Sequence, residues 1–151
     1  GGILLILGLA LGFTNYLVFA QIPTLAVEWV SAHISSPWVF LLCLNLALFA
    51  IGCLMDVYSA IVVIVPLITP LGLAFGIHPI HLGIIFLANL EAGFLTPPVG
   101  MNLFLSSYRF GKPMVQIMKA VIPMLLATVF TVLLITYVPW LTTWLPSLFN
   151  K

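Results

Sequence analysis

The sequence has very few charged residues. Its 151 residues contain 4 Lys and Arg and 3 Asp and Glu, so only 5% are charged, whereas 64% are hydrophobic and the mean hydropathy is +1.32. About a quarter of the residues of a typical soluble domain are charged, so this composition excludes an ordinary soluble domain. The net charge of +1 provides no basic patch for phosphates, and we expect no nucleic-acid partner.

Long stretches without any charged residue occupy most of the chain. Four of them, 1–27, 29–55, 57–90 and 120–150, exceed the roughly 20 residues that cross a bilayer. The sequence therefore predicts an all-α polytopic membrane protein in a lipid bilayer. Because no initiator Met or basic leader precedes the first apolar run, we expect a fragment of a longer protein. The expected segments are a transmembrane helix at 3–30, a helical hairpin at 37–75, a broken helix at 79–110, a transmembrane helix at 113–138 and a tail at 139–151. We expect a kink near Gln21 in the first helix. The first arm of the hairpin is apolar apart from Asn45.

The strongest local feature is a Thr-Pro-Pro run inside the fourth segment. Pro97 and Pro98 remove two amide donors and exclude carbonyls one turn back, so regular helix cannot continue through them. Backbone at membrane depth must find partners or line a cavity. Gly93 and Gly100 flank the break, and Thr96 adds a hydroxyl oxygen. This pattern favours an oxygen cage for a monovalent cation, the alternative being a simple proline kink satisfied by neighbouring helices.

A second polar group falls at the expected tip of the hairpin, where Gly52 precedes Asp56 and Ser59. A carboxylate inside the hydrocarbon layer is costly and suggests a functional site. Asp56 could help to hold a cation, or it could cap the returning helix by accepting amide hydrogens near Ser59. The two roles are compatible.

Glu91 lies about one turn before the break, with Asn89 beside it and Asn102 beyond it. It could carry a proton, or it could be a structural acid bonded to backbone that the prolines free. His78 and His81 flank a proline without the helical spacing of a zinc hydrolase, so we interpret them as solvated interfacial histidines.

The distribution of basic and aromatic residues predicts an orientation. Arg109, Lys112 and Lys119 cluster at one junction, which the excess of basic residues in cytoplasmic loops assigns to the inside, so we expect 109–119 to be cytoplasmic and the C-terminus periplasmic. The four tryptophans would then form one interfacial belt on the opposite side; they are Trp29, Trp38, Trp140 and Trp144. Because no Lys or Arg occurs in 1–108, an anionic substrate could meet this part of the chain only through helix N-termini, amides, hydroxyls or a bound cation.

Three motifs carry a family resemblance. The sequences GCLMD at 52–56, GIHPIHLGII at 76–85 and above all GFLTPPVGMNLF at 93–104 resemble the large membrane subunit of tripartite ATP-independent periplasmic (TRAP) transporters, over nearly the whole chain. The resemblance implies the C-terminal part of that subunit, which would be half of an elevator-type inverted-repeat transporter in the bacterial inner membrane. The hairpin at 37–75 would then be re-entrant, and 83–108 would be a discontinuous helix. Its function would be sodium-coupled import of an organic acid such as a dicarboxylate or sialic acid. Its partners would be a small membrane subunit and a periplasmic substrate-binding protein, with Na⁺ as coupling ion, no organic cofactor and no enzymatic activity.

The resemblance also implies site residues. One sodium site would use carbonyls near Gly52, Gly93 and Val99 together with the Thr96 hydroxyl. Other positions would contact the substrate or support the site, and they are Asp56, Ser59, Asn89, Pro97, Pro98, Gly100 and Asn102. Two alternatives stay open: an elevator-type dicarboxylate/sodium symporter that works without a binding protein, and an intramembrane enzyme that uses Asp56, Glu91 and the histidines.

Overall fold

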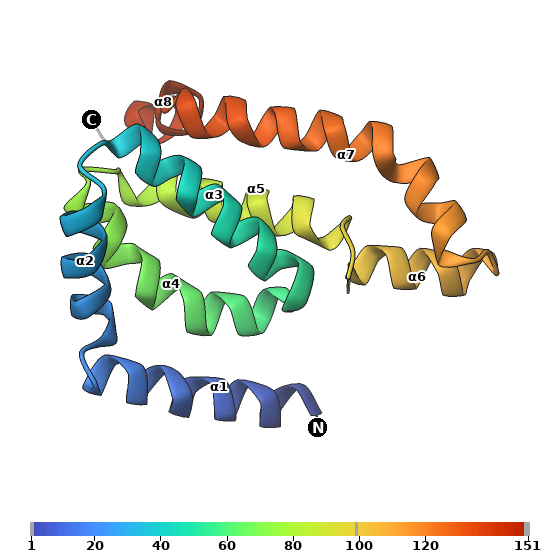
Figure 1. Cartoon of the computed structure of the whole chain (residues 1–151), viewed down its shortest axis with the longest axis horizontal. Coiled ribbons are helices and arrows are strands. Elements are labelled where there is room, and N and C mark those ends of the chain that lie inside the picture. The colour runs from blue at the N-terminus through green and yellow to red at the C-terminus, as the bar shows by residue number, and fades with distance from the viewer. Residues whose placement is uncertain (1, 99, 150–151) are drawn as a thin grey trace.

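The computed structural model describes residues 2–98 and 100–149, and over these residues the secondary structure is entirely helical. Most of the helices run back and forth along one direction, as Figure 1 shows. The helices are α1 (Gly2–Phe19), α2 (Ile22–His33), α3 (Pro37–Leu54), α4 (Val57–Ala74), α5 (Pro79–Phe94), α6 (Met101–Phe110), α7 (Met114–Tyr137) and α8 (Trp140–Phe149). The predicted all-helical fold class is confirmed.

The first expected segment, 3–30, consists of two helices. α1 and α2 meet at a bend of 60° at Gln21, which has a left-handed backbone conformation with φ of 55°. Pro23 begins α2, where its missing amide hydrogen costs no helical hydrogen bond. The kink expected near Gln21 is therefore present, and it turns α2 across the ends of the other helices (Figure 1).

α3 and α4 form a hairpin with a two-residue connection, Met55 and Asp56. Pro37 begins α3 after two serines, and Asp56 caps α4. Pro66 and Pro70 lie inside α4 without ending it. The hairpin turns close to the end of α5 (Figure 1), and α1 packs along α4, where the Thr14 hydroxyl donates to the Val62 carbonyl at 3.0 Å.

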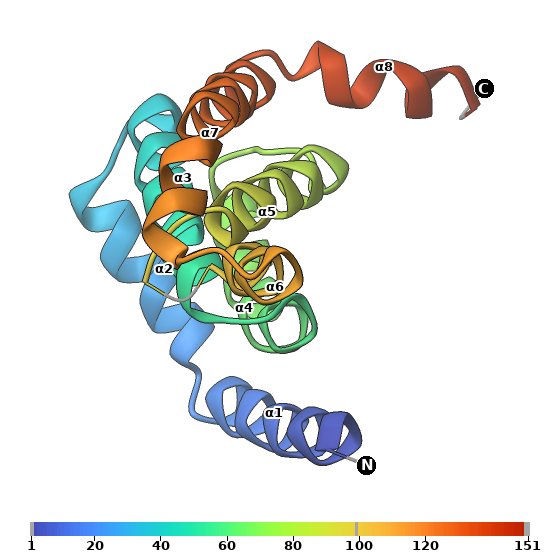
Figure 2. The ribbon, with the colours of Figure 1, turned by 90° about the vertical axis from the view of Figure 1, so that its right-hand side faces the viewer.

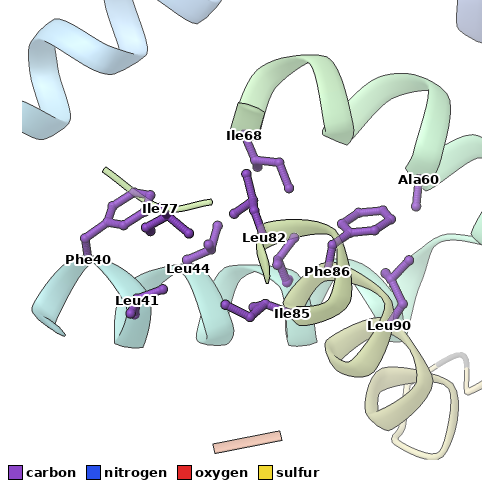
Figure 3. Close-up of a cluster of buried hydrophobic side chains, with 11 residues drawn as sticks. Phe40, Leu41, Leu44, Ala60, Ile68, Ile77, Leu82, Ile85, Phe86 and Leu90 are labelled. Atoms are coloured by element: carbon purple, nitrogen blue, oxygen red, sulfur yellow. The ribbon is translucent and has the colours of Figure 1, made fainter. Parts of the chain in front are cut away.

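The hydrophobic core lies where α5 packs between the two arms of the hairpin. Figure 3 shows side chains of α5 pointing toward side chains of both α3 and α4. Ile85, Phe86 and Leu90 of α5 are almost completely buried there. The core therefore fixes α5 to the hairpin; its labelled members are Phe40, Leu41, Leu44, Ala60, Ile68, Ile77, Leu82, Ile85, Phe86 and Leu90.

Beyond the break, α6 continues away from the hairpin, and α7 returns beside α6 and α5 (Figure 1). The segment expected as a tail, 139–151, is helical over Trp140–Phe149. Figure 2 shows this helix, α8, leaving the end of α7 and projecting with its far end away from the other helices.

Three described helices, α3, α4 and α7, are long and apolar enough to cross a membrane, and the bent pair α1 and α2 makes a fourth candidate. α5 is apolar but shorter. Most of the surface of α7 is exposed, which suits a helix that faces lipid or other protein segments. The fold is that of a polytopic membrane protein.

Candidate functional site

The hairpin and the broken helix meet at two glycines. A Cβ atom added to Gly93 would lie 2.6 Å from the Cα and from the carbonyl carbon of Gly52, and 2.9 Å from the amide nitrogen of Cys53. A Cβ atom added to Gly52 would lie 3.0 Å from the Cα of Leu90. Real Cβ atoms do not approach a backbone so closely, so only glycine permits this contact between α3 and α5. The structure thus brings two of the predicted sodium-site residues together.

The interruption predicted at the Thr-Pro-Pro run is present, because α5 ends at Phe94 and α6 begins at Met101. Thr96 follows the last turn of α5, where its amide donates to the Gly93 carbonyl at 2.9 Å. Its hydroxyl donates to the Ala92 carbonyl at 3.0 Å. A hydroxyl has one hydrogen and two acceptor lone pairs, so the Thr96 oxygen can still bind a cation while it makes this bond.

Gly100 begins α6 with a left-handed φ of 37°. A Cβ atom there would lie 2.8 Å from the Thr96 carbonyl oxygen, so glycine lets the chain return past that oxygen. Pro97 and Pro98, which separate Thr96 from this turn, are exposed. The predicted sodium ligand Val99 lies outside the described residues.

Asp56 is held in place by hydrogen bonds at the tip of the hairpin. Its Oδ2 accepts from the amides of Tyr58 at 3.0 Å and Ser59 at 3.1 Å, and its Oδ1 accepts from the Ser59 hydroxyl at 2.6 Å. The capping role considered from the sequence is confirmed.

A pocket of about 590 Å³ lies beside the break and is lined by residues from α1, the start of α4, α5 and α6. Polar side chains from three of them line it: Asp56 and Tyr58 from the hairpin, Glu91 from α5 and Asn102 from α6. No Lys or Arg lies among its lining residues within 2–98 and 100–149. Met101 and Asn102 place the first turn of α6 at the pocket, and no side chain caps that helix end. The free amides of a helix N-terminus favour a negatively charged group.

Glu91 lies at the pocket with an exposed side chain. The sequence also suggested that it might bond to backbone freed by the prolines. Within the part of the chain that the structure describes, no hydrogen bond joins the Glu91 side chain to the break, so this interpretation is unsupported there. Its carboxyl group lines the same pocket as Asp56 and is the second acidic side chain at the site.

Asn89 does not line this pocket. It is buried and donates to the Asn45 side-chain oxygen and, at 2.8 Å, to the Ile85 carbonyl. The Thr136 hydroxyl approaches the same Asn45 oxygen at 3.1 Å. Sequence reasoning assigned no role to Asn45 or Thr136, although each interrupts an apolar helix, and polar residues at membrane depth usually find one another.

The expectation of two solvated histidines is wrong for His81. His78 is exposed, but His81 is only 3% exposed, and its Nε2 donates to the Thr136 carbonyl at 3.2 Å. Its Nδ1 lies 2.7 Å from the Thr142 hydroxyl. His81 lies in the first turn of α5, and because α5 packs against α7 and α8 the ring is buried against Thr136 and Thr142.

The structure thus defines a polytopic membrane protein in which a helix is broken beside a hairpin tip, with carbonyls, a hydroxyl and two carboxyl groups around the break. Helix breaks of this kind occur in transporters. Residues 1–141 match the family model described as "Tripartite ATP-independent periplasmic transporter, DctM component". The chain belongs to this family, as its motifs suggested.

Curated relatives agree with the family match. The C4-dicarboxylate TRAP transporter large permease protein DctM of Pseudomonas aeruginosa is 37% identical over 145 residues, which cover 96% of this chain and 34% of the relative. The sialic acid TRAP transporter large permease protein SiaM of Vibrio cholerae is 32% identical over 85% of this chain and 30% of its own length. A putative dicarboxylate transporter subunit of Paracoccus pantotrophus is 36% identical over 97% of this chain and 69% of its own length.

The chain spans about a third of the length of the first of these relatives. The relatives are named as transporter subunits, not as enzymes. No solved structure matches the chain.

Proposed function

We propose that the chain is the C-terminal part of a TRAP-type large permease that imports an organic acid across the bacterial inner membrane, driven by sodium. The observation that carries the proposal is the backbone contact between Gly52 and Gly93 directly before the Thr96 break. The names of the relatives, which include dicarboxylate and sialic acid transporters, support an organic acid as substrate.

The ion would bind where the hairpin tip meets the break. The Gly93 carbonyl accepts one hydrogen bond, from the Thr96 amide, and has a second lone pair for a cation. The Thr96 hydroxyl donates to the Ala92 carbonyl, so its oxygen can also bind a cation. Gly52 brings the end of α3 against Gly93, three residues before Thr96. Sodium prefers such oxygen ligands, and half-helix ends in transporters coordinate it in this way.

The substrate would bind in the neighbouring pocket of about 590 Å³. Its anionic group would meet the first turn of α6 and the Asn102 amide, because these are the donors at the pocket wall. Asp56 and Glu91 would repel the anion unless a cation lies close by. The substrate would therefore bind only when sodium is bound, and this requirement would couple substrate transport to sodium transport.

Movement across the membrane would depend on the same site. The hairpin ends beside the end of α5, whereas α6 extends about 15 Å further, so the tip would lie inside the membrane as a re-entrant hairpin. An empty site would leave polar groups uncompensated there, which disfavours carriage through an apolar layer, whereas a filled site would permit it. This is the behaviour that an elevator-type mechanism requires.

Thr96→Val tests the ion site in the complete transporter. Valine keeps the shape but removes the oxygen, so the sodium concentration for half-maximal uptake should rise about tenfold while the amount of protein in the membrane changes little. The measurement is uptake of a panel of labelled organic acids into vesicles over a range of sodium gradients. Thr96→Ser, which retains the hydroxyl, is the control and should stay near the wild type. An unchanged sodium dependence in Thr96→Val would remove this residue from the site.

The partners that we propose are a small membrane subunit and a periplasmic binding protein. The family match favours this arrangement over a symporter that works alone. Omitting the binding protein from vesicles should abolish uptake at micromolar substrate. Full uptake by the large subunit without it would favour the independent symporter.

A further inference from the structure

One oxygen atom joins three helices in the interior. The Asn45 Oδ1 on α3 accepts from the Asn89 Nδ2 on α5 and lies 3.1 Å from the Thr136 hydroxyl on α7. Asn45 is 5% exposed, Asn89 2% and Thr136 0%. These polar contacts are surrounded by apolar side chains, where a hydrogen bond is strong and an unpaired polar atom is costly.

The carbonyl of Ile85 fixes the orientation of both amides. A carbonyl only accepts, so the Asn89 atom that lies 2.8 Å from it must be the nitrogen. The Asn45 atom that faces this nitrogen must then be the oxygen. The Asn45 nitrogen is left without a partner among the described residues, and Asn45 and Asn89 both line a small, otherwise apolar pocket of about 180 Å³.

The stability of the folded protein does not by itself explain why two asparagines are buried here. Apolar residues of similar shape would remove the unpaired nitrogen and could be as stable or more stable. A hydrogen bond between two side-chain amides, however, requires a particular distance and angle between donor and acceptor. It therefore forms at only one relative position of the two helices. Packed leucines tolerate sliding and rotation much better. Buried polar pairs of this kind can therefore fix the register between helices.

The amide pair lies close to the glycine contact along both helices. Asn89 lies four residues before Gly93, and Asn45 lies seven residues before Gly52, which correspond to about one and two helical turns on the same faces. A shift of α3 by one residue would move it about 1.5 Å and rotate a side chain into the position of Gly52. The backbone contact leaves no space for that side chain.

We propose that Asn45 and Asn89 are positioning residues: their amide pair sets the register in which the hairpin tip meets the end of α5, and through it the affinity of the ion site. The proposal rests on the proposed function for its effect on sodium. Its effect on the register can be measured independently of transport.

The register is measured with spin labels in the complete transporter. Ala50→Cys on α3 and Leu87→Cys on α5, both exposed, carry the labels in a Cys43→Ser, Cys53→Ala background. Asn45→Leu is suited to the test because its partners keep other bonds: Asn89 still donates to the Ile85 carbonyl, and Thr136 to the Val132 carbonyl at 2.8 Å. We expect its distance distribution to broaden or shift, and that of Leu44→Val, a core variant of the same helix, to match the wild type. An unchanged distribution in Asn45→Leu would overturn the proposal.

The effect on the ion site is measured as the sodium concentration for half-maximal uptake. We expect this concentration to rise about fivefold in Asn45→Leu and in Asn89→Leu. The double variant should be no worse than either single variant, because one shared contact is lost in all three. Leu44→Val should lower the unfolding temperature without changing this concentration. A broadened register with unchanged sodium dependence would overturn the link to the ion site, whereas sodium-independent uptake by the wild type would instead contradict the proposed function.

Discussion

At the scale of single residues, Gly52 and Gly93 determine how closely two helices approach. The missing side chains allow backbone-to-backbone contact where the hairpin tip meets the last turn of α5. Gly83 differs from Gly93 in this respect, since a Cβ atom added to Gly83 would contact nothing within 4 Å. The two positions differ although both lie in α5, and this difference makes a matched experiment possible.

Gly93→Ala should destabilise the protein by about 1–3 kcal/mol, because the added methyl group would overlap the backbone of Gly52 and Cys53. Gly83→Ala in the same helix should be neutral or should stabilise by about 0.5–1 kcal/mol, since alanine favours helix and the space is open. Thermal unfolding of the purified transporter in detergent provides the measurement. Equal unfolding temperatures for the two variants would show that the helices are not in contact at Gly93.

Residues whose roles are local could be predicted from the sequence, and residues whose roles depend on distant partners could not. The cap at Asp56 involves residues two and three positions away. The environment of His81 depends on Thr136 and Thr142, more than 50 positions away, so an exposed position was a reasonable but wrong expectation. Asn45 was visible as a polar residue in an apolar helix, but its partners lie on α5 and α7.

At the scale of helices, the return of the hairpin depends on how α4 begins. Asp56→Ala would remove three hydrogen bonds to the first turn of α4 and should cost about 0.5–2 kcal/mol. Asp56→Ser, which keeps a capping oxygen, should lose much less. Hydrogen exchange of the amides of Tyr58 and Ser59 measures the effect directly. Equal protection of these amides in both variants would contradict a capping role.

The helix boundaries follow largely from proline and glycine, whose effects on the backbone are local. Pro37, Pro79 and Gly111 stand at helix ends, and the Thr-Pro-Pro run separates α5 from α6. Length alone left open how far the hairpin reaches, because 18 residues suffice either to cross or to turn back. The tertiary contact between Gly52 and Gly93, which joins the tip of the hairpin to the end of α5, is contained in no local pattern.

At the scale of the whole molecule, the tryptophans lie toward one end and the basic residues Arg109, Lys112 and Lys119 toward the other. Trp38 stacks on Tyr137 at the last turn of α7, with ring centroids 5.4 Å apart, and Trp140 and Trp144 follow in α8. Lys112 precedes the first turn of α7, and the 24 residues of that helix span about 36 Å. This separation matches an aromatic belt on one side of a bilayer and basic residues on the other.

The separation predicts which end lies inside the cell. Because basic residues are retained in cytoplasmic loops, Lys112→Cys should react with a membrane-impermeant thiol reagent only after cells are permeabilised, and Ser147→Cys on α8 should react in intact spheroplasts. Cys43→Ser and Cys53→Ala in the complete transporter remove the two native thiols of this chain. Mass shift on a gel reports the labelling, and both variants should import substrate. The reverse labelling pattern would show that the topology is inverted. The end of the hairpin opposite its tip would then lie on the cytoplasmic side.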